Sequence, residues 1–149
     1  MLIEFLRFFL EIKSLLFFLF GYFDKEEDNL IALKNVSYGL KPDGIFILDY
    51  FNSEWVRATL TTDYHLLAGN IDFHIQKKIE NGHVIKIIEF GTEGKAFHFQ
   101  EKVRLFTLHD FEVLFAKAGL TIVEKFGDYQ LHPFDEKTSN RLILQAIRS

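Results

Sequence analysis

Six side chains that could hold a small molecule stand where apolar runs of the sequence end: Tyr22, Asp49, Tyr50, Asn52, Asp128 and Tyr129. Carboxylate, amide and phenol groups orient a ligand by donating and accepting hydrogen bonds. In open parallel sheets, ligands bind beyond the carboxyl ends of the strands, which is where we expect these residues. A structural reading stays open at each position, because Asp and Asn also form turns and a loop aromatic can simply be half-buried.

A metal site is the first alternative, since the sequence holds six histidines: His65, His74, His83, His98, His109 and His132. None of them falls in an H-x-x-x-H or H-E-x-x-H spacing. Metal sites need several ligands in a fixed geometry. We therefore expect solvated surface histidines and no metal site.

The elements that would position the six side chains begin with an apolar run at residues 15–20, which suits a buried strand. Asp24, with Glu27 three residues later, forms a capping-box pattern at the start of a helix. The Lys-Pro-Asp-Gly sequence at residues 41–44 ends that helix in a turn. The next run, residues 45–48, is apolar on both faces, which is typical of a central parallel strand covered by helices.

The middle of the chain has a different pattern. From Tyr64 to Phe106 apolar and polar residues alternate, and Asn81-Gly82 is a strong signal for a two-residue hairpin. We predict an antiparallel meander with one face in water. Three lysines of this segment would form either a basic lid over an anionic substrate or a charged edge that discourages aggregation, and we favour the edge: Lys77, Lys78 and Lys86.

The last third returns to the helix and strand pattern. Thr107 and Asp110 form a cap-like pair, and the apolar helical face that follows ends at Gly119. Residues 120–126 and 141–147 are strand candidates on either side of a loop. The order strand, helix, strand, meander, helix, strand, strand predicts a mostly parallel sheet with flanking helices.

Composition excludes several classes of function. The chain has 149 residues, 18 of them Phe, no Cys and a formal net charge of -4, so we expect one folded domain over residues 1–149. No basic stripe marks a nucleic-acid surface. A chain without Cys forms neither disulfides nor thiolate metal sites and fits a cytoplasmic location.

Residues 1–23 are rich in Phe, but four charges interrupt them, so we expect a buried or docking segment and no integral membrane span. A membrane-surface helix and a true membrane element are the alternatives.

Three stretches resemble a known family. They are residues 20–24 (FGYFD), residues 40–52 (LKPDGIFILDYFN) and residues 106–144, where Ala-Gly-Leu at 118–120 ends a helix. Together they are similar to the segment from the fourth to the seventh strand of small class I S-adenosylmethionine (SAM)-dependent methyltransferases. Asp43 replaces the first glycine of the family's Leu-Lys-Pro-Gly-Gly turn.

The resemblance implies an α/β fold, namely a partial Rossmann-like methyltransferase sheet with flanking helices and the antiparallel meander at residues 64–106 as an insertion. It implies SAM as cofactor and a small molecule as methyl acceptor, with the six side chains named above as substrate contacts. Phe20 and Gly21 are the remaining candidates for cofactor contacts. No catalytic residue is required, because methyl transfer depends largely on positioning the nucleophile against the methyl group.

The resemblance also implies a defective cofactor site. The family binds its cofactor mainly at a glycine-rich turn in the first half of the fold, where the missing side chain lets the backbone come close. The sequence contains no G-x-G-x-G. Phe18 and Leu19 stand where the family has small polar residues, and residues 1–15, an atypical apolar start, do not resemble it at all. An eroded or frameshifted start would explain these departures.

We therefore expect a truncated SAM-dependent methyltransferase domain that is impaired as a single chain. One alternative is a non-catalytic half-domain that docks with a partner, or with itself, through its Phe-rich start. Another is a peripheral membrane fragment anchored by residues 1–20.

Overall fold

The computed structural model describes residues 20–21, 23 and 25–149. The chain divides into two compact units. The first unit contains the described residues as far as Val56 together with Phe106–Ser149, and the second contains Arg57–Leu105.

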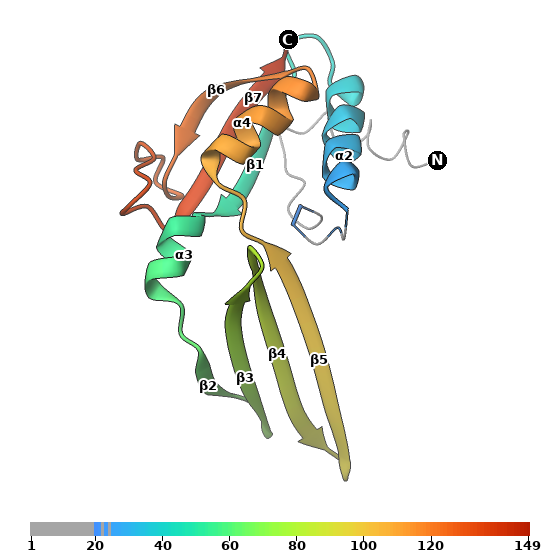
Figure 1. The fold of residues 1–149 in the computed structure, drawn as a ribbon, viewed down its shortest axis with the longest axis vertical. Helices are drawn as coiled ribbons and strands as arrows, with labels where there is room; N and C mark the ends of the chain where they lie inside the picture. The colour runs from blue at the N-terminus through green and yellow to red at the C-terminus, as the bar shows by residue number, and fades with distance from the viewer. Residues whose placement is uncertain (1–19, 22, 24) are drawn as a thin grey trace. The chain divides into compact units, whose positions relative to one another are not determined.

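The first unit is built on a three-stranded sheet in the order β1-β7-β6 (Figure 1). Its strands are β1 (Ile45–Phe51), β6 (Leu120–Phe126) and β7 (Arg141–Arg148), and its helices are α2 (Glu26–Gly39) and α4 (Leu108–Lys117). The short helix α3 (Ser53–Thr59) begins in the first unit and ends in the second. Because β7 runs antiparallel to both of its neighbours, β1 and β6 point in the same direction.

The prediction of a mostly parallel sheet is therefore wrong for the described strands. No helix lies between β6 and β7, so the chain returns through a loop and pairs in the opposite direction. The parallel neighbour expected for β1 falls on residues 15–20, of which 15–19 lie outside the described residues, while Phe20 is in a turn.

Helix α4 shows how the first unit closes its core. The Thr107 hydroxyl accepts the Asp110 backbone N–H while the Asp110 carboxylate accepts the Thr107 N–H, which confirms the predicted capping box. Gly119 has φ +72° after the helix, as the C′ glycine prediction requires. Phe111 and Phe115 are fully buried, and Phe111 packs edge-on against Tyr50 of β1 at 5.1 Å between ring centroids.

Helix α2 packs against α4, and the Ser37 hydroxyl of α2 donates to the Gly119 carbonyl at 3.2 Å. Lys25 occupies the N-cap of α2 without a side-chain hydrogen bond. The cap predicted at Asp24 lies outside the described residues.

The second unit is a four-stranded antiparallel sheet in the order β2-β3-β4-β5, which confirms the predicted meander. Its strands are β2 (Asp63–Ala68), β3 (Ile71–Glu80), β4 (His83–Thr92) and β5 (Lys95–Arg104). Asn81 and Gly82 both have positive φ, at +50° and +72°, as a type I′ hairpin turn requires.

The lysines of this sheet do not form a charged edge, so that prediction is wrong. Lys77 and Lys78 lie on β3 and Lys86 lies on β4, which are the two inner strands. Lys86 pairs with Glu101 at 3.5 Å and Lys78 pairs with Glu80 at 3.2 Å. The alternation of apolar and polar residues predicts the face of the sheet on which each lysine lies. It does not predict whether the strand is at the edge or inside, because strand order depends on how all four strands pair.

Candidate functional site

A buried carboxylate lies near the carboxyl end of β1. The Asp49 side chain is 3% exposed, and its Oδ1 accepts hydrogen bonds from Arg141 Nε at 2.7 Å and Arg141 Nη2 at 2.5 Å. The strand register explains the contact: Asp49 lies opposite Ile143 on β7, and Arg141, two residues from Ile143, points to the same face. The guanidinium thus compensates a charge that could not otherwise be buried.

Tyr129 covers the second oxygen of this carboxylate. Its hydroxyl donates to Asp49 Oδ2 at 2.8 Å, and its ring lies 5.8 Å from Arg141 Cζ. The tyrosine itself is 67% exposed. The hydrogen bond to Asp49, with burial as a second cause, raises the pKa of the Tyr129 phenol, so this group remains a hydrogen-bond donor at neutral pH.

The loop that carries Tyr129 is held by two other predicted site residues. Asn52, which is 3% exposed, donates from Nδ2 to the carbonyls of Glu136 and Ser139 at 2.7 and 2.8 Å. Asp128 accepts from the His132 backbone at 3.2 Å and pairs with His132 Nδ1 at 2.7 Å. That pairing with His132 is the largest reason why the pKa of Asp128 is lowered.

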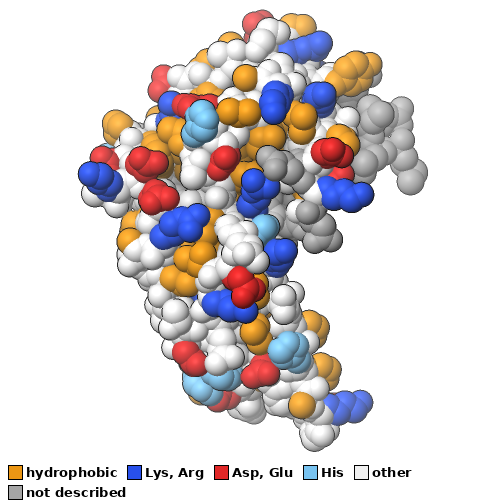
Figure 2. Space-filling view, viewed as in Figure 1, with side chains coloured by type: hydrophobic (Ala, Val, Ile, Leu, Met, Phe, Trp, Pro, Cys, Tyr) orange, Lys and Arg blue, Asp and Glu red, His pale blue; other side chains and the backbone are white. Residues whose placement is uncertain are grey.

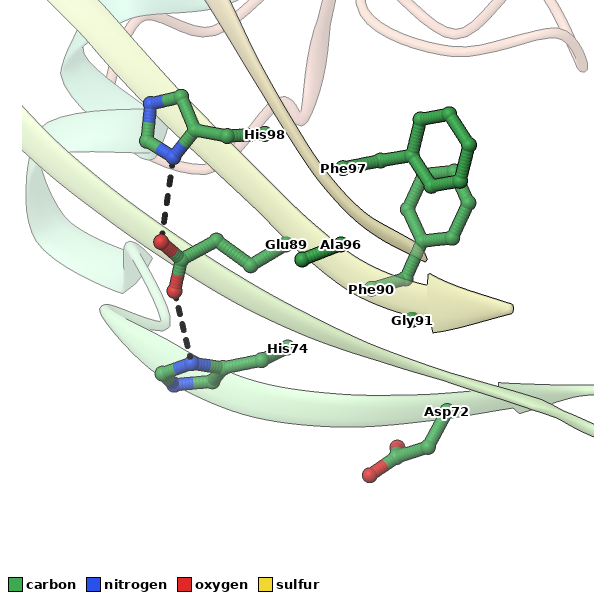
Figure 3. Close-up of a pocket in the computed structure, with 8 residues that line it drawn as sticks. All are labelled: Asp72, His74, Glu89, Phe90, Gly91, Ala96, Phe97 and His98. Carbon is green, nitrogen blue, oxygen red and sulfur yellow. Dashed lines mark hydrogen bonds and ion pairs between the residues drawn. The ribbon is translucent and has the colours of Figure 1, made fainter. Parts of the chain in front are cut away.

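A second polar group crosses the four-stranded sheet. His65, His74, Glu89 and His98 are direct neighbours on successive strands, and Figure 2 shows histidine and acidic side chains side by side on this sheet. The two Glu89 oxygens face His98 Nδ1 at 3.1 Å and His74 Nδ1 at 3.6 Å (Figure 3). The His74 ring stacks on His65 at 4.7 Å.

This row borders an open pocket of about 400 Å³, where Gly91 and Ala96 leave room beside Glu89 (Figure 3). The hydrogen bond that His74 Nε2–H donates to Asp63 Oδ1 raises the pKa of His74. Within the described residues, no group of three or more His, Cys, Asp or Glu is arranged to hold a metal ion. The polar groups of the row satisfy one another, so the row is an internal network and offers a ligand few free groups.

Comparison with known proteins identifies the fold. Neither the models of protein families nor the curated protein sequences gave a match. Among solved structures, a SAM-dependent methyltransferase from Clostridium acetobutylicum superposes with a TM-score of 0.73 at 21% identity, over 87% of this chain and 54% of that protein. The CcbJ methyltransferase from Streptomyces caelestis gives a TM-score of 0.70 at 16% identity, over 87% of this chain and 56% of that one. This chain has part of the class I methyltransferase fold.

A third similar structure is CalS10, an amino pentose methyltransferase from Micromonospora echinaspora, with a TM-score of 0.59 at 14% identity over 90% of this chain and 56% of that one. The chain thus spans about half the length of each of these proteins. Within the described ranges of this partial methyltransferase fold, no helix is long and apolar enough to cross a membrane.

The two residues considered for cofactor contact are both buried in the partial methyltransferase fold. Phe20 is 4% exposed. Gly21 has φ +85°, and its N–H already donates to Asn29 Oδ1 at 3.3 Å. This amide is therefore engaged within the chain.

The methyltransferase fold brings two of the six predicted substrate residues together, Asp49 and Tyr129. Tyr50 is 6% exposed and packs in the aromatic core. Asp128 and Asn52 stabilise the loop 127–140, and Tyr22 lies outside the described residues. Sequence reasoning missed Arg141. Its strand also contains Gln145 and Arg148, so the local sequence gives no signal that Arg141 has a buried partner.

Proposed function

We propose that this chain supplies the acceptor-binding part of a SAM-dependent methyltransferase that methylates a small polar molecule. The observation that carries the proposal is the fold match over 87% of the chain with a TM-score of 0.73. Fold alone does not fix function, so the site must support it independently. The acidic, cysteine-free composition fits the cytoplasmic location that we propose with it.

The Asp49, Tyr129 and Arg141 group is the proposed acceptor site. It lies at the carboxyl end of β1, where open α/β sheets bind their ligands. It combines an exposed aromatic ring, a phenol donor and a buried carboxylate. Such a mixture of a ring surface and a few fixed polar groups is typical of small-molecule sites. The amino pentose named for CalS10 is an acceptor of this general kind.

We further propose that this chain alone binds the cofactor weakly. Its sequence holds no G-x-G-x-G turn, and the Gly21 amide is already bonded to Asn29. Isothermal titration of the chain with S-adenosylhomocysteine should give an affinity much weaker than micromolar. Micromolar binding would contradict this part of the proposal.

The methyltransferase assignment is tested by supplying the part of the methyltransferase fold that this chain does not span. The part of the Clostridium acetobutylicum protein that this chain does not cover is fused ahead of residue 25, and a folded fusion is selected by circular dichroism and gel filtration. The fusion should bind S-adenosylhomocysteine and transfer labelled methyl groups from SAM to a panel of small amines and sugars. A well-folded fusion that binds no S-adenosylhomocysteine would argue against the assignment.

The second candidate is a non-catalytic half-domain that associates with another copy or a partner. Large apolar side chains on the four-stranded sheet favour it, because Leu66 and Phe99 are 51% and 53% exposed. The Phe-rich start first proposed for this contact lies outside the described residues. Gel filtration with light scattering decides, and a monomer at all concentrations would remove this candidate.

A further inference from the structure

The two oxygens of Asp49 are used unequally. Oδ1 accepts both hydrogen bonds from Arg141, at 2.7 and 2.5 Å. Within the described part of the chain, Oδ2 accepts one side-chain hydrogen bond, from the Tyr129 hydroxyl at 2.8 Å. The first oxygen is held by a residue of the sheet, whereas the second is covered by a residue of a loop.

We propose that Tyr129 is a displaceable cap, and that the methyl acceptor binds by donating an O–H or N–H to Asp49 Oδ2 in its place. This inference rests on the proposed function. Because Arg141 already compensates the charge of Asp49, a neutral donor fits this site better than a second cation. A methyl acceptor must also keep a free lone pair, so the ligand class is a neutral hydroxyl or amine compound.

The geometry allows the Tyr129 side chain to move away from Asp49 Oδ2. Its side chain is 67% exposed, so most of the ring already contacts water and little burial is lost when it moves. A phenol is protonated at neutral pH, so the Tyr129 hydroxyl donates to Asp49 and imitates the hydroxyl or amine that replaces it. Gln130, next in the chain, is anchored separately, because its N–H donates to Asp128 Oδ1 at 2.9 Å.

Arg141 is a positioning residue in this scheme. Two N–H groups of one rigid guanidinium bind the same carboxylate oxygen, and such a fork restricts rotation of the carboxylate. When Tyr129 leaves, Oδ2 therefore keeps its direction and presents a preformed acceptor to the ligand.

The test uses the chain itself and two matched probes. Methyl α-D-glucopyranoside carries hydroxyl donors on a neutral ring, and its fully O-methylated derivative has the same ring without donors. Affinities are measured by NMR titration for the wild type, Tyr129→Phe and Tyr38→Phe. Tyr38 is the matched control, because it is equally a surface tyrosine, at 76% exposure on α2.

Removing the phenol hydroxyl removes the competing donor. Tyr129→Phe should therefore bind the glucoside about fivefold more tightly than the wild type, the factor expected for about one net hydrogen bond, while Tyr38→Phe should not change the affinity. In the Tyr129→Phe background, Asp49→Asn should abolish the gain in glucoside affinity. If Asp49→Asn does not fold, Arg141→Lys serves instead. It keeps the charge but loses the guanidinium fork, so it should reduce the gain in affinity. The O-methylated probe should bind no variant.

Unchanged glucoside affinity in Tyr129→Phe, or equal binding of both probes, would overturn the inference. A lower melting temperature of Tyr129→Phe with unchanged probe affinity would show that the tyrosine only anchors its loop. The titration needs no cofactor, so its result is separate from the fusion experiment. A fusion that methylates while Tyr129→Phe behaves as wild type would leave the proposed function standing and remove this inference alone.

Discussion

Replacing Gly127 by Ala should destabilise the loop that carries Tyr129. Gly127 follows β6, donates its N–H to the His132 carbonyl at 2.8 Å and accepts from the Arg141 N–H at 3.1 Å. A Cβ at this position would collide with the Ser139 Oγ and stand 2.7 Å from the Ser139 Cβ. Since both backbone groups of Gly127 are hydrogen-bonded, the chain cannot move away without losing one of them.

The magnitude follows from the overlap. Overpacking by one methyl group costs about 1–3 kcal/mol when neighbours cannot shift. Ser139 cannot shift freely, because its Oγ accepts the Asp135 N–H at 2.9 Å and its carbonyl accepts from Asn52. We therefore expect a loss of about 2 kcal/mol in the free energy of unfolding.

Urea denaturation measures this loss, with Gly91→Ala as the matched control. A Cβ at Gly91 would meet only the Lys95 carbonyl, at 3.6 Å, which is an ordinary contact. The cause is tested in a Ser139→Gly background, where both colliding atoms are gone. There the cost of Gly127→Ala should fall below about 1 kcal/mol, as expected when two neighbouring substitutions are coupled. Equal costs for Gly127→Ala in both backgrounds, or a cost no larger than that of Gly91→Ala, would refute the steric reasoning.

Three further predictions concern other parts of the chain. Phe111→Ala should lower the free energy of unfolding, measured by urea denaturation, by about 3–5 kcal/mol because the Phe111 ring is fully buried. Val113 is 38% exposed, so Val113→Ala should lower it by about 0.5 kcal/mol. Similar losses for the two variants would contradict the assigned core face of α4. Thr107→Ala should cost about 1 kcal/mol by removing the cap of α4, and an unchanged unfolding midpoint would count against the capping box. His74 should titrate above its ordinary pKa because of Asp63. The hydrogen bond to Asp63 therefore stabilises the folded state fully at pH values below the pKa of His74 in the unfolded chain, and this stabilisation is lost as the pH rises through the pKa of His74 in the folded protein. NMR titration should show that Asp63→Asn lowers the pKa of His74. An unchanged pKa would refute the role given to Asp63.

The sequence predicted well what depends on neighbouring residues. The alternation from Tyr64 onward and the Asn81-Gly82 turn indicated the meander, because strand period and hairpin geometry are local properties. The capping box of Thr107 and Asp110 spans a single helical turn, so it too could be read directly.

The features that the sequence did not predict depend on long-range pairing. The insertion of β7 between β1 and β6, and the inner position of the strands that carry Lys77 and Lys86, follow from contacts between distant segments. Arg141 was missed for the same reason, because it is 92 residues from Asp49.

One contact between strands was predictable but not predicted. The register of β2 against β3 brings His65 opposite His74, and this pairing could have been deduced from a two-residue turn at Gly69 and Asn70.

The central place of β7 also bears on how the protein is made. Because β1 and β6 both pair with β7, and β7 is the last of the three to be synthesised, neither earlier strand has its partner in this sheet when it leaves the ribosome. The sheet, and with it the junction of Asp49 with Arg141, must form after translation of residue 148. Until then the backbone N–H and C=O groups of β1 and β6 that pair with β7 lack those partners, and this interval is when a chaperone would matter most to this protein.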